Sequence, residues 1–277
     1  MRFRLALCNE VVRGLDFPAQ CALAASLGYD GIELAPFTLS DAPHELSGER
    51  VVAVRRAAEQ AGVTIAGLHW LLIRPEGLSL TDADPAVRAR TIEVMRRLVG
   101  LCAELGGSYL VHGSPAQRML PEAGAAQARG WAIEAFTAAG EAAMQAGVTY
   151  CVEPLARRET NFINTVTEAA ALVRDIGLPG LRTMLDTSAA ALTETASAAA
   201  LLAEWLPTGL IAHVQVNDRN RRGPGQGEDR FGPVLRALQE HAYDGWVGVE
   251  PFDYLPDGPC CAARAIGYLR GLEEAQT

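Results

Sequence analysis

Short apolar runs alternate along the chain with longer segments in which apolar residues recur at helical spacing. The apolar runs cover residues 3–8, 31–34, 64–72, 108–111, 148–152, 181–185, 210–216 and 246–249. The helical segments cover about residues 17–27, 48–61, 86–105, 125–146, 167–176, 193–206, 231–241 and 259–274. Several of these segments end at a glycine, the residue that most readily adopts the left-handed conformation of a helix C-cap. The pattern predicts eight strand–helix units in succession.

Strands that are apolar on both faces are typical of a parallel sheet covered by helices. Eight such units in sequence predict a single (β/α)8 TIM barrel of the α/β class, spanning residues 1–277. A doubly wound open sheet is the alternative. No GxGxxG motif follows the first apolar run, which disfavours that alternative.

The composition narrows the choice of partners. Basic residues number 24 and acidic residues 33, so the formal net charge is −9. This balance argues against a general surface for binding nucleic acid or anionic membranes.

No apolar stretch approaches the roughly 18 residues that a membrane-spanning helix needs. The N-terminal segment MRFRLALCNE has a basic start, but no apolar region typical of a secretory signal follows it. None of the six cysteines forms a CxxC pair. We therefore expect a cytoplasmic protein whose thiols are reduced.

Residues of metal-ligand type stand at or near the ends of seven predicted strands. They are Glu33, His69, His112, Glu153, Asp186, His213 and Glu250. In a TIM barrel the carboxyl ends of the strands meet at one mouth, where the chemistry takes place. A single buried acid can be structural, but a ring of acids in one mouth is costly unless it is paired or binds a metal. Carboxylates with an imidazole favour Mn²⁺, Mg²⁺ or Co²⁺ over a thiolate-bound structural zinc.

Several phrases along the chain carry a family resemblance. CVEPL, MLDTS, IAHVQVND and VGVEPF occur in this order, together with LGYDGIEL and RNRRGPGQGE. The set resembles the sugar phosphate isomerase/epimerase superfamily of xylose isomerase-like TIM barrels, and most of all the ketose 3-epimerases of the tagatose/psicose kind. The resemblance covers essentially the whole chain.

The resemblance implies a site with one divalent ion, Mn²⁺ first, with Mg²⁺, Co²⁺ or Zn²⁺ as alternatives. The implied ligands are Glu153, Asp186, His213 and Glu250, of which Glu153 and Glu250 would double as the acid/base pair. It also implies a homodimer.

Further implied contacts concern the substrate. The resemblance assigns Glu159 and Arg219 to substrate hydroxyls and the metal-site carboxylate. The histidine that usually follows the strand-6 aspartate by three residues is Ala189 here, so the particular ketose stays open.

Three more residues at strand ends are predicted to line the pocket. We expect His69 and His112 to donate hydrogen bonds to substrate or to Glu153, with a satisfied core histidine as the alternative for each. Trp70, with Phe37, is expected to form an apolar wall for the C–H face of a sugar or to pack against a neighbouring loop or subunit.

These features predict a metal-dependent sugar isomerase or epimerase. It would move a proton at a carbon next to a carbonyl through a metal-stabilised enediolate, with a small sugar or keto-sugar as substrate. Dehydration of a keto-inositol or keto-sugar on the same metal is the first alternative. An abasic-site endonuclease is disfavoured by the charge and by missing histidines, and a non-catalytic sugar-binding barrel by the presence of Glu153 and Glu250.

Overall fold

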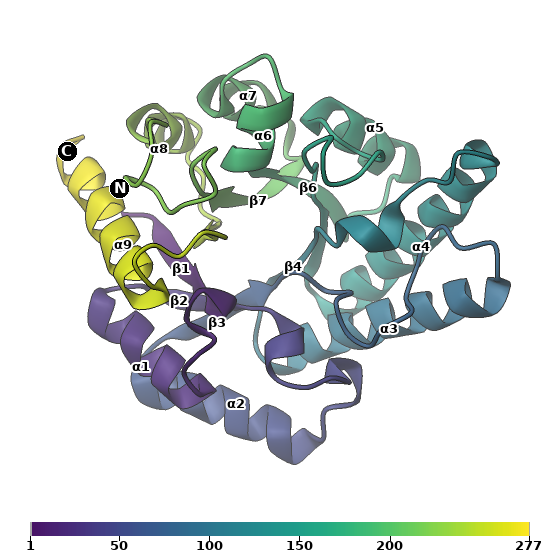
Figure 1. Ribbon diagram of the computed structural model, residues 1–277, viewed down its shortest axis with the longest axis horizontal. Coiled ribbons are helices and arrows are strands. Elements are labelled where there is room, and N and C mark those ends of the chain that lie inside the picture. Colours follow the sequence, from purple (N-terminus) through teal and green to yellow (C-terminus); the bar gives the residue numbers. More distant parts are fainter. Residues whose placement is uncertain (1, 277) are drawn as a thin grey trace.

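The computed structural model describes residues 2–276, whose eight strands form a closed parallel barrel with helices around it (Figure 1). Each strand pairs with the next, and β8 pairs with β1. The strands are β1 (Arg4–Cys8), β2 (Gly31–Leu34), β3 (Thr64–Leu68), β4 (Tyr109–His112), β5 (Thr149–Val152), β6 (Leu181–Asp186), β7 (Ile211–Val216) and β8 (Trp246–Val249). The prediction of a TIM barrel is confirmed. The predicted domain limits, residues 1 and 277, lie outside the described range.

The helices alternate with the strands and form the outer layer (Figure 1). They are α1 (Phe17–Leu27), α2 (Gly48–Ala61), α3 (Pro85–Glu104), α4 (Ala125–Ala146), α5 (Val166–Ile176), α6 (Thr187–Thr193), α7 (Ala198–Trp205), α8 (Gly232–Glu240) and α9 (Gly258–Glu274).

The two largest differences from the predicted element boundaries have local reasons. The segment after β6 forms two helices, because the Asp186 side chain accepts a hydrogen bond from the Ala189 amide and begins α6 at once. Strand β3 ends at Leu68, before the predicted limit of residue 72. Trp70, two residues later, has a left-handed backbone conformation with a φ of 54°. Both changes occur at the barrel mouth.

The apolar core has two parts. A small cluster fills the barrel itself, and a larger one lies between the barrel and its helices. The inner cluster contains Ala6, Ala66, Tyr109, Val111, Cys151, Met184 and Trp246. Because side chains alternate along a strand, the neighbours of these residues in β4 and β5 point outward to the helices.

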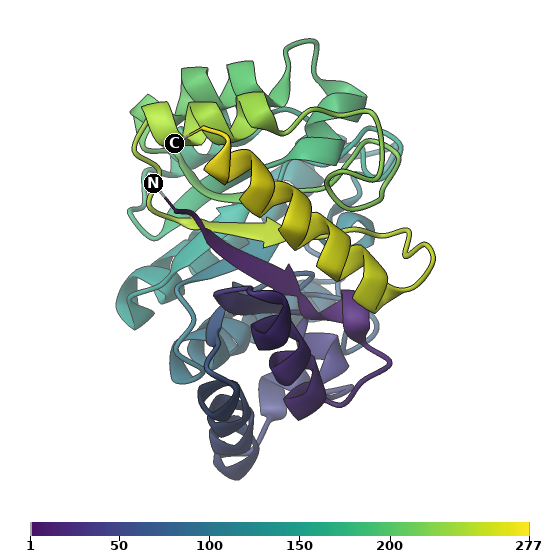
Figure 2. The ribbon, with the colours of Figure 1, turned by 90° about the vertical axis from the view of Figure 1, so that its left-hand side faces the viewer.

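The two ends of the described chain lie side by side (Figure 2). The Phe3 amide donates to Glu273 at 2.7 Å, and Arg270 donates to the Phe3 carbonyl at 2.9 Å. These contacts hold α9 against β1, next to the pairing of β1 with β8 that closes the barrel.

The register between β6 and β7 decides which side chains share a layer of the mouth. The pairing shifts between Thr183 and Met184, after which His213 lies beside Met184 and Gln215 lies beside Asp186. An extra residue in one strand produces such a shift. The side chain of β7 that is level with Asp186 is therefore Gln215.

No helix within residues 2–276 has both the length and the apolar character needed to cross a bilayer. All six cysteines are free, and only Cys260 among them is exposed. The expectation of reduced thiols agrees with this arrangement.

The packing between barrel and helices gives a stability prediction. Phe136 on α4 is fully buried, so Phe136→Ala should lower the free energy of unfolding by about 3–5 kcal/mol through lost burial and the cavity left behind. Met144→Ala on the same helix, where the side chain is 49% exposed, should change it by less than about 0.5 kcal/mol. Urea unfolding of both variants measures the difference, and equal losses would contradict this account of the core.

Candidate active site

Three carboxylates meet at the carboxyl end of the barrel. Glu153 follows β5, Asp186 ends β6 and Glu250 follows β8. One ligand atom from each lies within 4.8 Å of the others, and each residue is at most 6% exposed. The structure therefore brings together three of the four residues predicted as metal ligands.

Crowding and burial make these groups hard to ionise in the metal-free protein. Burial raises the pKa of Glu250 to about 8 and that of Asp186 to about 7. Burial, and then the negative charges of Glu250 and Asp186, raise the pKa of Glu153 well above its ordinary value. Such a group of buried acids requires a cation or shared protons.

The surroundings of the three carboxylates suit a bound cation. Asp186 Oδ1 accepts from the Ala189 amide at 2.6 Å, whereas Asp186 Oδ2 is buried without a hydrogen-bond partner. A Cβ at Gly113 would lie 2.4 Å from Glu153 Oε2, so the absence of a side chain there leaves room for that carboxylate. Hard divalent cations prefer oxygen ligands of this kind.

His213 lies away from this group. Its Nε2 is 3.1 Å from Glu33 Oε2, and its ring stacks on Tyr109 with centroids 4.0 Å apart. It precedes Gln215 by two residues on β7, which places it roughly 6–7 Å deeper in the barrel. The structure thus does not bring the predicted imidazole ligand to the carboxylates.

Gln215 takes the position next to Asp186. Its Nε2 donates to Glu33 Oε1 at 2.8 Å, and its Oε1 is buried without a hydrogen-bond partner. An ionised carboxylate can only accept, so Glu33 orients the amide and leaves the Gln215 oxygen free. Alternation along HVQV places both residues on one face, but only the register with β6 shows which one is level with Asp186.

Glu33 anchors the layer below the carboxylates. It is fully buried and accepts from Tyr109 Oη at 2.8 Å as well as from Gln215. Burial alone would raise its pKa, but the neighbouring His213 and the hydrogen bond from Tyr109 outweigh burial and lower it to about 2. A Cβ at Gly248 of β8 would lie 2.3 Å from Glu33 Oε2, so the glycine leaves room for this carboxylate.

The two predicted pocket histidines have different surroundings. His69 is at the mouth, with Nδ1 2.9 Å from Glu250 Oε1 and Nε2 2.9 Å from Glu10 Oε2. His112 packs edge-on against Phe136 of α4 and contacts Tyr150 Oη through Nδ1 at 2.7 Å. His112 therefore points from β4 toward the helix layer, the setting of a core histidine, and we leave it out of the proposed site.

Aromatic side chains gather where three strands end. The Trp70 ring lies 5.6 Å from Phe37 and 5.9 Å from Phe252, with edge-to-face geometry in both pairs. The Arg221 guanidinium is 5.0 Å from the centre of the Phe252 ring. These contacts show Trp70 packed against neighbouring loops, which was the expected alternative, and the wall for a sugar stays a prediction. Phe252 and Arg221 join Trp70 and Phe37 in this cluster.

Arg219 and Glu159, which were expected to contact substrate hydroxyls and the metal-site carboxylate, make hydrogen bonds within their own loops. Arg219 pairs with Asp229, its Nε 2.7 Å from Oδ1, and its side chain is 58% exposed. Glu159 Oε2 accepts from the Ala156 amide at 3.2 Å. Neither residue contacts the three carboxylates directly.

Arg118 is a buried cation that the sequence prediction missed. It ends the 3-10 helix η4 (Pro115–Arg118), is fully buried, and donates through Nη2 to the Glu153 carbonyl at 2.7 Å. Burial lowers its pKa to about 10, although the negative charge of Glu153 acts in the opposite direction. Its positive charge helps to offset the acidic group beside it.

The comparisons with known proteins identify the family. The model of the xylose isomerase-like TIM barrel family matches residues 21–272. The chain belongs to this family. The resemblance stated from the sequence is confirmed.

Curated relatives of the chain are sugar epimerases and isomerases, the enzyme class that the sequence predicts. D-psicose 3-epimerase of Agrobacterium fabrum is 29% identical over 234 residues, which cover 82% of this chain and 76% of the relative. L-ribulose 3-epimerase of Mesorhizobium japonicum is 30% identical, covering 81% of this chain and 72% of the relative. A putative hydroxypyruvate isomerase of Homo sapiens is 26% identical, with 91% and 88% coverage.

Solved structures share the fold. A structure of L-ribulose 3-epimerase superposes with a TM-score of 0.83 at 23% identity, covering 99% of this chain and 96% of the other. A 3-keto-D-glucoside 4-epimerase of E. coli gives a TM-score of 0.82 at 18% identity, with 98% and 100% coverage.

The raised pKa values predict how pH couples stability to metal binding. In the unfolded chain Glu250 ionises near pH 4.5, whereas burial in the folded metal-free protein raises its pKa to about 8. The metal-free protein should therefore lose stability as pH rises through this range, while a divalent ion binds the ionised form. The increase in melting temperature on adding Mn²⁺ should be larger at pH 8 than at pH 6.

Calorimetric melting scans with and without Mn²⁺ measure this difference. Glu250→Gln, which removes one titrating ligand, should reduce the pH dependence, and the exposed Glu141→Gln should not. An equal Mn²⁺-induced shift at both pH values in the unsubstituted protein would contradict the assignment.

Proposed function

We propose that the chain is a metal-dependent sugar epimerase or isomerase that moves a proton at a carbon next to a carbonyl. The observation that carries this proposal is the group of Glu153, Asp186 and Glu250, whose ligand atoms lie within 4.8 Å of one another. Its relatives include 3-epimerases of D-psicose and L-ribulose. Small sugars or keto-sugars are the proposed substrates, and cytoplasmic location and a homodimer stay predictions.

One divalent ion, with Mn²⁺ as the first candidate and Mg²⁺, Co²⁺ or Zn²⁺ as alternatives, would be held by the three carboxylates and Gln215. The Gln215 oxygen replaces the predicted His213, because Gln215 is level with Asp186 and its Oε1 has no other partner. When bound, such an ion polarises the carbonyl and hydroxyl oxygens of a substrate as a Lewis acid.

We assign proton transfer to the two glutamates. Glu153 and Glu250 stand at the ends of β5 and β8, with β6 and β7 between them. One carboxylate takes the proton from the carbon, and the other donates a proton to the opposite face, which inverts that carbon. Their roles exchange when the reaction runs in reverse.

Three neighbouring residues shape the surroundings of this pair. The His69 ring contacts Glu250, Arg118 binds the Glu153 carbonyl, and Gly113 leaves room for the Glu153 side chain. The cluster of Trp70, Phe37 and Phe252 offers apolar edges for the C–H groups of a sugar. We retain Trp70 and His69 as proposed site residues, with Glu159 and Arg219 as proposed contacts at the rim.

A titration tests the ligand set. Gln215→Ala should weaken Mn²⁺ binding by more than about 10-fold, since even a partner outside the ligand shell typically contributes that much. His213→Asn should have a smaller effect, because His213 contacts Glu33 and not the carboxylates. Isothermal titration calorimetry of both variants measures the two dissociation constants. Loss of Mn²⁺ binding in His213→Asn alone would return His213 to the ligand set.

An exchange experiment tests the reaction. Mn²⁺-loaded protein in D₂O, given D-psicose, D-fructose, L-ribulose, hydroxypyruvate or an inosose, should introduce deuterium at a carbon beside the carbonyl of at least one compound. Glu153→Gln should reduce this exchange by at least about 100-fold, the lower end of what general acid–base catalysis contributes. Glu141→Gln is the control, because Glu141 is an exposed residue of α4.

Proton NMR identifies the labelled carbon and separates epimerisation from isomerisation. A product lighter by one water would indicate the dehydratase alternative. No exchange on any compound by a protein that binds Mn²⁺ would contradict the proposal for these substrates.

A further inference from the structure

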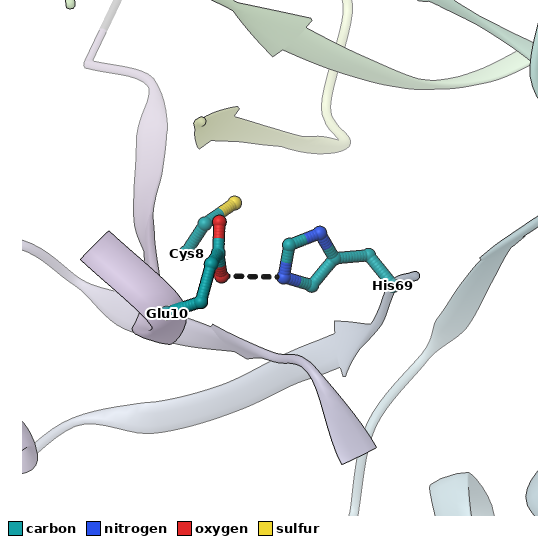
Figure 3. A group of neighbouring side chains, drawn as sticks. All are labelled: Cys8, Glu10 and His69. Atoms are coloured by element: carbon teal, nitrogen blue, oxygen red, sulfur yellow. Dashed lines mark hydrogen bonds and ion pairs between the residues drawn. The ribbon is translucent and has the colours of Figure 1, made fainter. Parts of the chain in front are cut away.

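A second group of polar side chains lies beside the three carboxylates. Cys8 ends β1, Glu10 belongs to the 3-10 helix η1 (Asn9–Val12), and His69 follows β3. Figure 3 shows the Glu10 carboxylate directed at the His69 ring, with the Cys8 thiol beside Glu10. Each of the three is at most 1% exposed.

His69 makes a contact through each of its ring nitrogens. Nε2 lies 2.9 Å from Glu10 Oε2, the contact dashed in Figure 3, and Nδ1 lies 2.9 Å from Glu250 Oε1. Both distances are ideal for hydrogen bonds to a carboxylate. A ring held at both ends cannot turn without losing both bonds, so Glu10 determines where His69 directs its second nitrogen.

The contact distinguishes the two proposed catalytic glutamates. Glu250 is tied through Oε1 to His69, which leaves Oε2 for a cation or a substrate proton. No residue in the range 2–276 donates a hydrogen bond to the carboxylate of Glu153, although Arg118 binds its carbonyl. One glutamate of the pair is therefore held in a fixed direction, and the other is not.

We propose that Glu10 and His69 are positioning residues that hold the Glu250 carboxylate in the direction needed for metal binding and proton transfer. The proposal rests on the proposed function, since it gives Glu250 that role. It adds a line of three side chains, Glu10–His69–Glu250, that runs from the end of β1 past β3 to β8.

A second metal site is the competing explanation for the same side chains. Cys8, Glu10 and His69 are all of ligand type, and their ligand atoms lie within 4.8 Å of one another. An ion there would have to use the His69 nitrogen that already contacts Glu10, or the one that contacts Glu250. The two short contacts favour the hydrogen-bonded arrangement.

Mn²⁺ titration of the metal-free protein tests the proposal with two variants of equal size. His69→Leu removes both ring nitrogens, and should weaken Mn²⁺ binding by about 10- to 100-fold, as the loss of an outer hydrogen-bond partner does. His69→Asn places an amide N–H near the position of Nδ1, and should recover most of that affinity. Equal losses in both variants would show a packing effect and overturn the proposal.

Two further variants complete the test. Glu10→Gln should weaken Mn²⁺ binding by less than His69→Leu, because His69 can still contact Glu250. Cys8→Ser is the matched control within the same group and should leave the affinity unchanged, since no hydrogen bond joins Cys8 to Glu10 or His69 in the described chain. Binding of two Mn²⁺ or Zn²⁺ ions, with the second lost in Cys8→Ser, would establish the metal site instead.

A double-mutant cycle separates failure of this proposal from failure of the proposed function. If the unsubstituted protein binds no Mn²⁺ and exchanges no deuterium, the proposed function has failed. The free energies of unfolding of His69→Leu, Glu250→Gln and the double variant, all metal-free, still report whether the two side chains interact. Additive losses in that cycle would overturn the positioning role.

Discussion

The structure depends on the placement of three carboxylates in a buried space where each disfavours the charge of the others. Glu153, Asp186 and Glu250 converge because β5, β6 and β8 end at the same barrel mouth. Burial raises the pKa of all three, so the site is unfavourable for charge without a cation. Next to this group lie an Asp186 oxygen without a hydrogen-bond partner, a glycine at position 113 and the buried Arg118.

Three groups of residues surround the carboxylates at the barrel mouth, and each group orients a different side chain. Below the carboxylates, Glu33 accepts hydrogen bonds from Tyr109 and Gln215 and so orients the Gln215 amide. Beside them, Glu10 and His69 reach Glu250. At the rim, Trp70 packs edge-to-face against rings from the loops after β2 and β8. Each group limits the freedom of a side chain that the proposed chemistry requires in one orientation.

Two features distinguish this chain from the ketose 3-epimerase pattern that its sequence resembles. Ala189 stands where that pattern has a histidine, so only its backbone amide, which donates to the Asp186 carboxylate, is polar here. Gln215, and not His213, is level with Asp186. A neutral oxygen in place of an imidazole gives the proposed site an all-oxygen ligand set, which suits Mn²⁺ or Mg²⁺.

The sequence by itself determined the barrel and the strand ends that supply its chemistry. Eight short apolar runs that alternate with helical segments are compatible with few folds other than a barrel. The three acids stand at the ends of strands, and in a barrel these ends meet at one mouth. Only the tertiary structure decided whether His213 or Gln215 lies level with Asp186. The reason is that the register shift between β6 and β7 depends on how the two strands pair, and the sequence of one strand does not reveal it. It also decided that His112 faces α4 while His69 faces Glu250, since the direction of a side chain at a strand end depends on the neighbouring strands and helices that pack there.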